Sequence, residues 1–279
     1  MSGTLFRLAA FTDDPGGGNP AGVWLGEALP DPAEMQRIAA EVGYSETAFI
    51  APAEGERRLV RYYSPEAEVS FCGHATVASG VQMGRLSGAG TYLLETAVGE
   101  VMVTVNQVEG EWQASLVSVT PEFRPAEPAL VEQVRELLGW QAEELDLKIP
   151  PARAYAGAWH LVLACRTEQR LARLEYDFER LKALMLREGL TTLQLVWRES
   201  EARFHARDPF PVGGVVEDPA TGAAAAALGG YLRDAGLLQA PAQLTILQGE
   251  AMGRPSRLQV DIPLSGGIVV TGPAVSLEG

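Results

Sequence analysis

The sequence of 279 residues predicts an α/β protein with two similar domains, each a curved, mixed and mostly antiparallel sheet wrapped around one central helix. The length corresponds to about two domains of roughly 100–150 residues. Short segments rich in β-branched and aromatic residues alternate with amphipathic helices. Each half also contains a helix of small residues that begins at a glycine, "SFCGHATVASGVQMG" (70–84) and "EDPATGAAAAALGGYL" (217–232). Such a helix leaves room for strands to close around it, and the match suggests a distant internal duplication.

The first half begins with an amphipathic helix at 31–43. Asp31 suits its N-cap, Pro32 its first position and Gly43 its end. The residues that follow predict strands at 45–50, 57–64 and 68–71, a helix at 74–84 and a β-meander over 91–119.

The second half repeats this inventory after a proline-rich segment. The residues "TPEFRPAEPA" (120–129) contain three prolines and indicate a linker, which we place at 120–127. The predicted domains are 1–119 together with 266–279, and 128–265. Beyond the linker the pattern predicts helices at 129–138 and 178–188, and strands at 158–165, 192–197, 202–206, 243–248, 257–262 and 266–272.

Composition excludes several classes of protein. The formal net charge is −14, and no cluster of Lys and Arg could bind nucleic acid. The two cysteines, Cys72 and Cys165, are too few for a disulfide scaffold and form no CxxC motif. No apolar segment approaches the ~18 residues of a membrane span, and the first residues do not resemble a signal peptide. We therefore expect a cytoplasmic protein without a nucleic-acid or membrane partner.

Two predicted helix starts are candidates for binding an anion. The first turn of a helix presents unpaired N–H groups and a positive dipole end. Gly73 and the turn Thr221-Gly222-Ala223 would each provide such a group. If both face one cleft between the domains, they could hold a small anionic metabolite from two sides. Asp218 in the second segment has an ordinary alternative, because Asp218-Pro219 could be a simple cap like Asp31-Pro32.

Three further side chains have chemistry that fits such a cleft. Glu46 begins a strand, where it is either an ordinary solvated carboxylate or an acid/base group. His74 begins a helix beside a glycine, where it either caps and packs or relays protons. Cys72 and His74 alone make a weak metal site, and we predict no metal. Cys72 could instead act as a thiolate base, although a small buried residue at the end of a strand is the favoured interpretation.

Six segments in this order resemble the PhzF-like family of phenazine biosynthesis, and they extend over essentially the whole chain. They are "GGNPAGVWL" (17–25), "YSETAFI" (44–50), "EVSFCGHATVASG" (68–80), "ARFHAR" (202–207), "VEDPATGAAAAALGGYL" (216–232) and "IVVTGPAVSLEG" (268–279). The resemblance implies a fold like that of diaminopimelate epimerase, an active site between two pseudo-symmetric domains, and a homodimer. It also implies isomerisation by acid/base proton transfer without a cofactor.

The resemblance also implies roles for particular residues. Glu46 resembles the shuttling acid/base, with His74 and Asp218 as its polar partners. The residues that would hold or support the substrate are Gly73, Thr221, Gly222, Ala223, Asn19 and Ser45. Two departures bear on the substrate and the chemistry. Ala223 occupies a position where many members have serine, and Cys72 matches a catalytic cysteine of related epimerases although "EDPATG" offers no second thiol.

The sequence thus predicts a cofactor-independent isomerase that moves a proton within a small carboxylate-bearing metabolite. Two alternatives stay open. One is an amino-acid racemase or epimerase that depends on Cys72 and an opposing group. The other is a non-catalytic protein that binds a small ligand.

Overall fold

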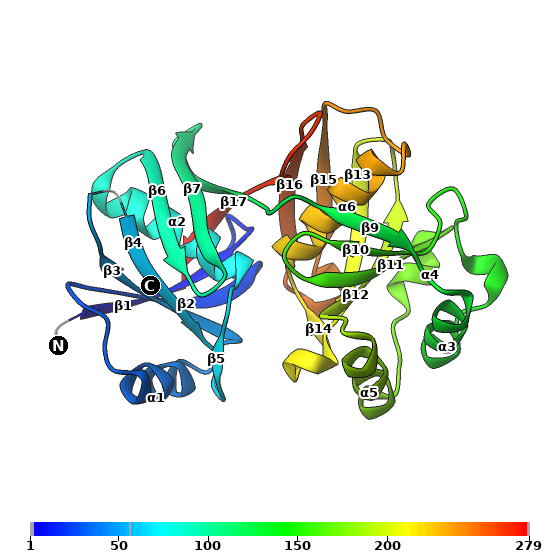
Figure 1. Cartoon of the computed structure of the whole chain (residues 1–279), viewed down its shortest axis with the longest axis horizontal. Coiled ribbons are helices and arrows are strands. Elements are labelled where there is room, and N and C mark those ends of the chain that lie inside the picture. Colours follow the sequence, from blue (N-terminus) through cyan, green and yellow to red (C-terminus); the bar gives the residue numbers. More distant parts are fainter. Residues whose placement is uncertain (1–2, 56, 278–279) are drawn as a thin grey trace. The chain divides into compact units, whose positions relative to one another are not determined.

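The computed structural model describes residues 3–55 and 57–277. The chain forms two compact units: unit 1 consists of Met1–Val117 and Thr271–Gly279, and unit 2 of Ser118–Val270 (Figure 1). Among the described residues, no helix is both long and apolar enough to cross a membrane.

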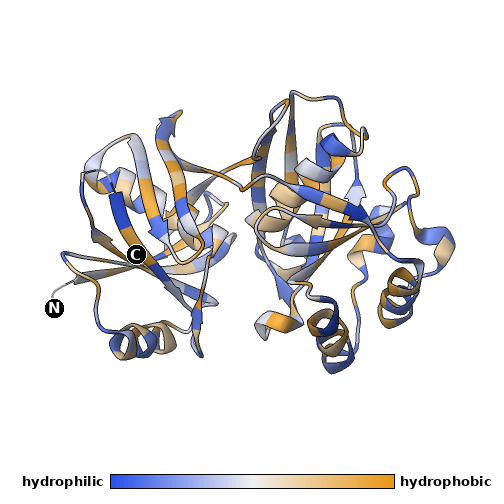
Figure 2. Cartoon of the chain, viewed as in Figure 1, coloured by the Kyte–Doolittle hydropathy of each residue, from blue (hydrophilic) through white to orange (hydrophobic). Residues whose placement is uncertain are grey.

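Unit 1 is a closed ring of strands around a helix. The strands are β1 (Gly3–Ala10), β2 (Asn19–Gly26), β3 (Glu46–Pro52), β4 (Arg57–Tyr63), β5 (Glu68–Val69), β6 (Gly90–Thr96), β7 (Gly99–Val108), β8 (Glu111–Val117) and β17 (Val269–Ser276). Neighbours pair in the order β1–β2–β3–β4–β6–β7–β8, and β17 pairs with both β8 and β1 to close the ring. The pairs β2–β3 and β4–β6 are parallel. Strand β7 alternates, with Val103 and Val105 buried and Thr104 and Asn106 exposed (Figure 2).

The helix at the centre of unit 1 is α2 (Gly73–Ser87), which packs against β1, β2, β3, β7 and β8. Its glycines allow this close approach. A Cβ atom at Gly80 would lie 2.7 Å from the Ala114 side chain, and one at Gly84 would lie 2.8 Å from the Trp112 ring. Larger residues at these positions would force the strands apart. The other helix of this unit, α1 (Pro32–Val42), connects β2 to β3.

Unit 2 repeats the plan with additional helices. Its strands are β9 (Glu122–Pro125), β10 (Ala152–Tyr155), β11 (Trp159–Cys165), β12 (Thr192–Arg198), β13 (Arg203–Pro209), β14 (Glu217–Asp218), β15 (Ala242–Gln248) and β16 (Ser256–Ile262). Its central helix α6 (Gly222–Asp234) packs against β9, β10, β11 and β16. Unit 2 has three further helices: α3 (Pro128–Leu138), α4 (Glu168–Ala172) and α5 (Phe178–Glu188). They contribute apolar side chains to a buried cluster of this unit, namely Leu130, Val134, Leu171, Leu181 and Met185.

The order of strand pairing is the same in the two units. From β1 to β7, through β6, successive neighbours pair antiparallel, parallel, antiparallel, parallel and antiparallel. The strands β10, β11, β12, β13, β15 and β16 pair in the same sequence of directions. The predicted fold class, two similar domains with mixed sheets around central helices, is confirmed. The repeated topology also supports the internal duplication suggested by the two small-residue helices.

The structure differs from the prediction around the proline-rich segment. Residues 120–127 were expected to form a linker, but Glu122–Pro125 form β9, which pairs antiparallel with β10. A proline fits the end of a strand, where it removes few ladder hydrogen bonds. Pro121 also packs against α6, because a Cβ at Gly230 would lie 2.2 Å from it. Strands β1, β2 and β10 and the short helix α4 were not among the predicted elements.

Candidate active site

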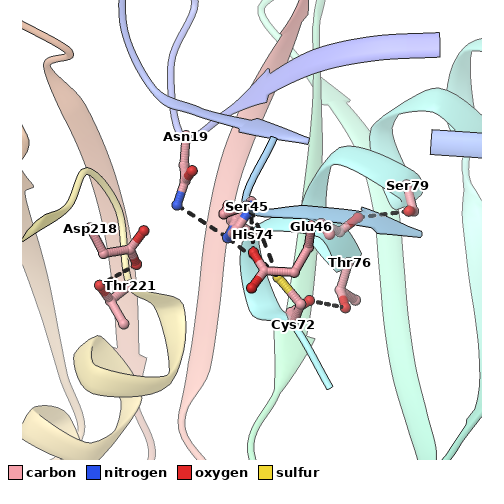
Figure 3. Close-up of polar contacts among 10 residues, drawn as sticks. Asn19, Ser45, Glu46, Cys72, His74, Thr76, Ser79, Asp218 and Thr221 are labelled. Atoms are coloured by element: carbon pink, nitrogen blue, oxygen red, sulfur yellow. Dashed lines mark hydrogen bonds and ion pairs between the residues drawn. The ribbon is translucent and has the colours of Figure 1, made fainter. Parts of the chain in front are cut away.

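The first cluster of reactive groups lies in unit 1 where β3 and α2 begin (Figure 3). Glu46 is the first residue of β3, Cys72 is the N-cap of α2, and His74 is the second residue of that helix. Glu46 Oε2 lies 3.5 Å from Cys72 Sγ and 3.5 Å from His74 Nε2. Cys72 Sγ lies 3.3 Å from His74 Nδ1. A carboxyl, a thiol and an imidazole therefore come together, which favours the acid/base interpretation of Glu46 over the solvated one.

Strand topology explains why Asn19 joins this cluster. β2 and β3 are parallel neighbours with Ala21 opposite Glu46, so both strands begin at the same edge of the sheet. Asn19, the first residue of β2, places its Nδ2 atom 3.1 Å from His74 Nδ1. Ser45, just before β3, places its hydroxyl 3.4 Å from His74 Nε2. Both imidazole nitrogens thus have polar partners, which orient the ring.

The start of α2 is held by a pair of buried hydroxyl groups. Thr76 donates to the Cys72 carbonyl at 2.7 Å, and its oxygen lies 2.7 Å from the Tyr62 hydroxyl. Burial raises the pKa of Tyr62 above its usual range, so this phenol stays protonated. The first N–H groups of the helix, beginning at Gly73, are oriented as an anion-binding terminus.

The second cluster lies in unit 2 where α6 begins (Figure 3). Asp218 accepts a hydrogen bond from the Thr221 hydroxyl at 2.6 Å. The Gln248 amide donates to the Asp218 carbonyl at 2.8 Å and to the Thr221 hydroxyl at 3.0 Å, and its oxygen accepts from the Thr221 N–H at 3.1 Å. The N-cap of α6 is Thr221 and the helix begins at Gly222. The alternative in which Asp218 and Pro219 form an ordinary cap pair is therefore wrong.

The two clusters occupy equivalent places in the repeat. β5 pairs with β4 through Val69 and Tyr62, and β14 pairs with β13 through Asp218 and Asp208. Each helical glycine follows four residues later, at 73 and at 222. Position by position, Cys72 therefore corresponds to Thr221, Gly73 to Gly222, and His74 to Ala223. The thiol and imidazole of the first site have a hydroxyl and a methyl group as their counterparts in the second.

Asp208 is a residue of the second site that the sequence patterns missed. It lies opposite Asp218 in the antiparallel pair β13–β14 and is fully buried. Neither of its carboxylate oxygens has a hydrogen-bond partner among residues 3–55 and 57–277. Burial raises the pKa of Asp208 well above its usual range, and the charge of Asp218 adds to the shift. The nearby Thr221 hydroxyl donates its hydrogen to Asp218 instead.

A signal for Asp208 existed in the sequence. Phe204, Ala206 and Asp208 alternate on the buried side of β13, and an acid at an inward position is unusual. The predicted strand at 202–206 ended too early to include it.

The structure distributes the predicted site residues between the two units. Those that come together in unit 1 are Asn19, Ser45, Glu46, Cys72, Gly73 and His74, and those of unit 2 are Asp218, Thr221, Gly222 and Ala223. Two other buried titratable residues, His160 and Cys165, are structural. The ring of His160 is held by Thr192 at 2.8 Å, and burial lowers its pKa to about 3. Burial raises the pKa of the Cys165 thiol to about 11.

Comparison with known proteins places these features in a family. Residues 8–279 match the sequence model of the family described as phenazine biosynthesis-like protein. An uncharacterized isomerase of Deinococcus radiodurans is 34% identical over 93% of this chain and 87% of its own length. The uncharacterized isomerase YfhB of Bacillus subtilis is 29% identical over 98% of this chain and 96% of its own. A Bacillus anthracis phenazine biosynthesis protein of the PhzF family superposes with a TM-score of 0.87 at 24% identity, over 99% of this chain and 97% of the other, which shows a shared fold.

Proposed function

The chain belongs to the family of phenazine biosynthesis-like proteins and is an isomerase, and we propose that it moves a proton within a small carboxylate-bearing metabolite by acid/base catalysis without a cofactor. The observation that carries the proposal is the position of Glu46. Its carboxyl is within 3.5 Å of both a thiol and an imidazole, at the start of a helix that attracts negative charge. The side chain is 14% exposed, so it is sheltered but accessible to a small molecule.

In this mechanism Glu46 removes a proton from an activated C–H group and returns it to another carbon of the same conjugated system. Negative charge that develops on the substrate is stabilised by the N–H groups at the start of α2. His74 Nε2 lies 3.5 Å from Glu46 Oε2, and the ring is kept in place by Asn19 and Ser45. Preorganised partners of this kind spare the site from reorganising during the reaction.

The second half of the proposal concerns unit 2. We propose that Asp218 and the turn Thr221-Gly222-Ala223 bind the same substrate molecule. The hydrogen bonds of Asp218 and Thr221 to each other and to Gln248 support a rigid polar surface there. Ala223 cannot donate the hydrogen bond that a serine would, which argues for a substrate other than the phenazine precursor. The homodimer implied by the family is part of the proposal, and sedimentation equilibrium tests it.

The test is solvent deuterium incorporation into a panel of dihydroaromatic and amino-acid-like acids, followed by Glu46→Gln. Glutamine keeps the shape of the side chain but cannot accept and return a proton. We expect kcat to fall by roughly 10²–10⁴-fold, while the exposed Glu54→Gln control stays unchanged. Turnover of an identified substrate by Glu46→Gln at nearly the normal rate would show that the mechanism is wrong. If no acid in a broad panel exchanges, the non-catalytic binding protein becomes the better interpretation.

A second candidate is the Cys72-dependent racemase or epimerase, because Cys72 Sγ lies 3.3 Å from His74. Two-thiol chemistry needs a second cysteine, and the counterpart of Cys72 in unit 2 is Thr221. Under the proposed mechanism, Cys72→Ser lowers kcat by less than about tenfold, since the serine still fits beside Glu46. A loss as large as that of Glu46→Gln, with deuterium exchange at a stereocentre, would favour the racemase instead.

A further inference from the structure

Glu46, Cys72 and His74 together form a set of metal donors that the sequence alone did not reveal. Cys72 and His74 by themselves gave too few ligands, and the third comes from β3, 26 residues before Cys72 in the chain. One donor atom from each residue lies within 4.8 Å of the other two. Thiolate, imidazole and carboxylate are the ligand types that Zn²⁺ binds in proteins.

The distances between these atoms fit one small ion. Bond lengths of about 2.3 Å to sulfur and about 2.0–2.2 Å to nitrogen and oxygen give edges of roughly 3.4–3.6 Å in a tetrahedron. The observed edges are 3.5 Å from Cys72 Sγ to Glu46 Oε2, 3.5 Å from Glu46 Oε2 to His74 Nε2, and 3.8 Å from Cys72 Sγ to His74 Nε2. Shifts of a few tenths of an ångström would complete three corners and leave the fourth for water.

Charge and hydrogen bonding also fit a divalent ion. A thiolate and a carboxylate together balance the charge of Zn²⁺, which offsets the repulsion from the positive end of α2. Asn19 Nδ2 contacts the opposite nitrogen of His74, and a flip of the Asn19 amide would place its oxygen there to accept from Nδ1–H when Nε2 binds the ion.

We propose that Zn²⁺, or the related ion Cd²⁺, binds to Glu46, Cys72 and His74 and inhibits the protein reversibly. On binding, the Cys72 S–H bond breaks, a metal–sulfur bond forms and the proton passes to solvent. Glu46 and His74 then donate lone pairs to the ion. Metal binding by itself is independent of any reaction, whereas inhibition rests on the proposed function.

The experiment uses the full chain without a polyhistidine tag, freed of metals with a chelator. Cd²⁺ is titrated while the ultraviolet charge-transfer absorption of a cadmium–thiolate bond is recorded, and Zn²⁺ binding is measured by calorimetry. We expect one ion per chain. Cys72→Ser should abolish the absorption, and Glu46→Gln should weaken the Zn²⁺ affinity by roughly 10–100-fold. The matched control is Cys165→Ser, which removes the other, buried cysteine and should titrate like the unaltered protein.

Three results would overturn the inference: no charge-transfer band in the unaltered protein, a band that survives in Cys72→Ser, or Zn²⁺ affinity unchanged in Glu46→Gln. Thermal melting of each variant controls for folding. Glu46→Gln and Cys72→Ser lie in different elements, β3 and the start of α2. Once a substrate is known, Zn²⁺ should abolish its deuterium exchange and a chelator should restore it. Zn²⁺ binding without any exchangeable substrate would support this inference and contradict the proposed function, and Glu46-dependent turnover without metal binding would do the reverse.

Discussion

The two central helices begin at equivalent positions of a repeated fold but carry different chemistry. At the start of α2 a thiol and an imidazole lie beside Glu46, so protons can be exchanged among three titratable groups. At the start of α6 the counterparts of Cys72 and His74 are Thr221 and Ala223, and the hydroxyl is already committed to Asp218. Under the proposed function, both helix starts bind the substrate, while Glu46 at the start of β3 in unit 1 acts as the base.

The largest expected effect in unit 2 comes from removing the charge of Asp218. Asp218→Asn keeps the shape of the side chain but removes its charge, and we expect kcat/KM to fall by about 10²-fold, less than for Glu46→Gln. Asp261→Asn is the matched control, because that carboxylate bonds Gln243 at the surface of the same unit. A larger loss for Asp218→Asn than for Glu46→Gln would move the principal base to unit 2.

The buried acid beside Asp218 tests the same comparison through stability. The pKa of Asp208 is raised by burial, so the folded state keeps a proton that the unfolded state loses above about pH 3.9. Stability contributed by this group is therefore present at low pH and falls as pH rises. Asn cannot titrate, so the advantage of Asp208→Asn should grow from pH 4 upward and reach about 1–3 kcal/mol near pH 8.

Chemical denaturation at several pH values measures this effect. If the stability of the unaltered protein relative to Asp208→Asn instead rises with pH, the buried carboxyl is ionised in the folded state, and the second site contains two charged acids.

The smallest expected effect comes from the hydroxyl that corresponds to the Cys72 thiol. Thr221→Val removes the hydrogen bond to Asp218 and should lower kcat by about tenfold and stability by about 1 kcal/mol. Thr192→Val is the control, because it removes a buried hydroxyl that bonds His160. We expect a similar loss of stability in both variants and a loss of activity in Thr221→Val alone. Equal rates in the two variants would show that Thr221 is only structural.

The sequence by itself determined much of the architecture. Alanine and glycine in 70–84 and 217–232 indicate helices thin enough to be enclosed by strands. The small size of these side chains is a local property that can be read directly from the sequence. Caps such as Asp31 and Gly43 defined α1 in the same way, and the structure confirms both. The prediction of a linker at 120–127 missed β9. Proline content describes only local backbone preference, whereas β9 is a strand because it pairs with β10.

Only the tertiary structure decided which side chains meet. The contact of Asn19 with His74, next to Glu46, depends on β2 and β3 running parallel, so that their first residues share one edge beside α2. The pairing of Asp208 with Asp218 depends on the register of β13 and β14. Neither follows from local propensity, because strand order and register are set by how the whole ring of strands closes around its helix. The sequence therefore names most of the candidate groups, Asp208 excepted, and the pairing of strands within each unit brings them together.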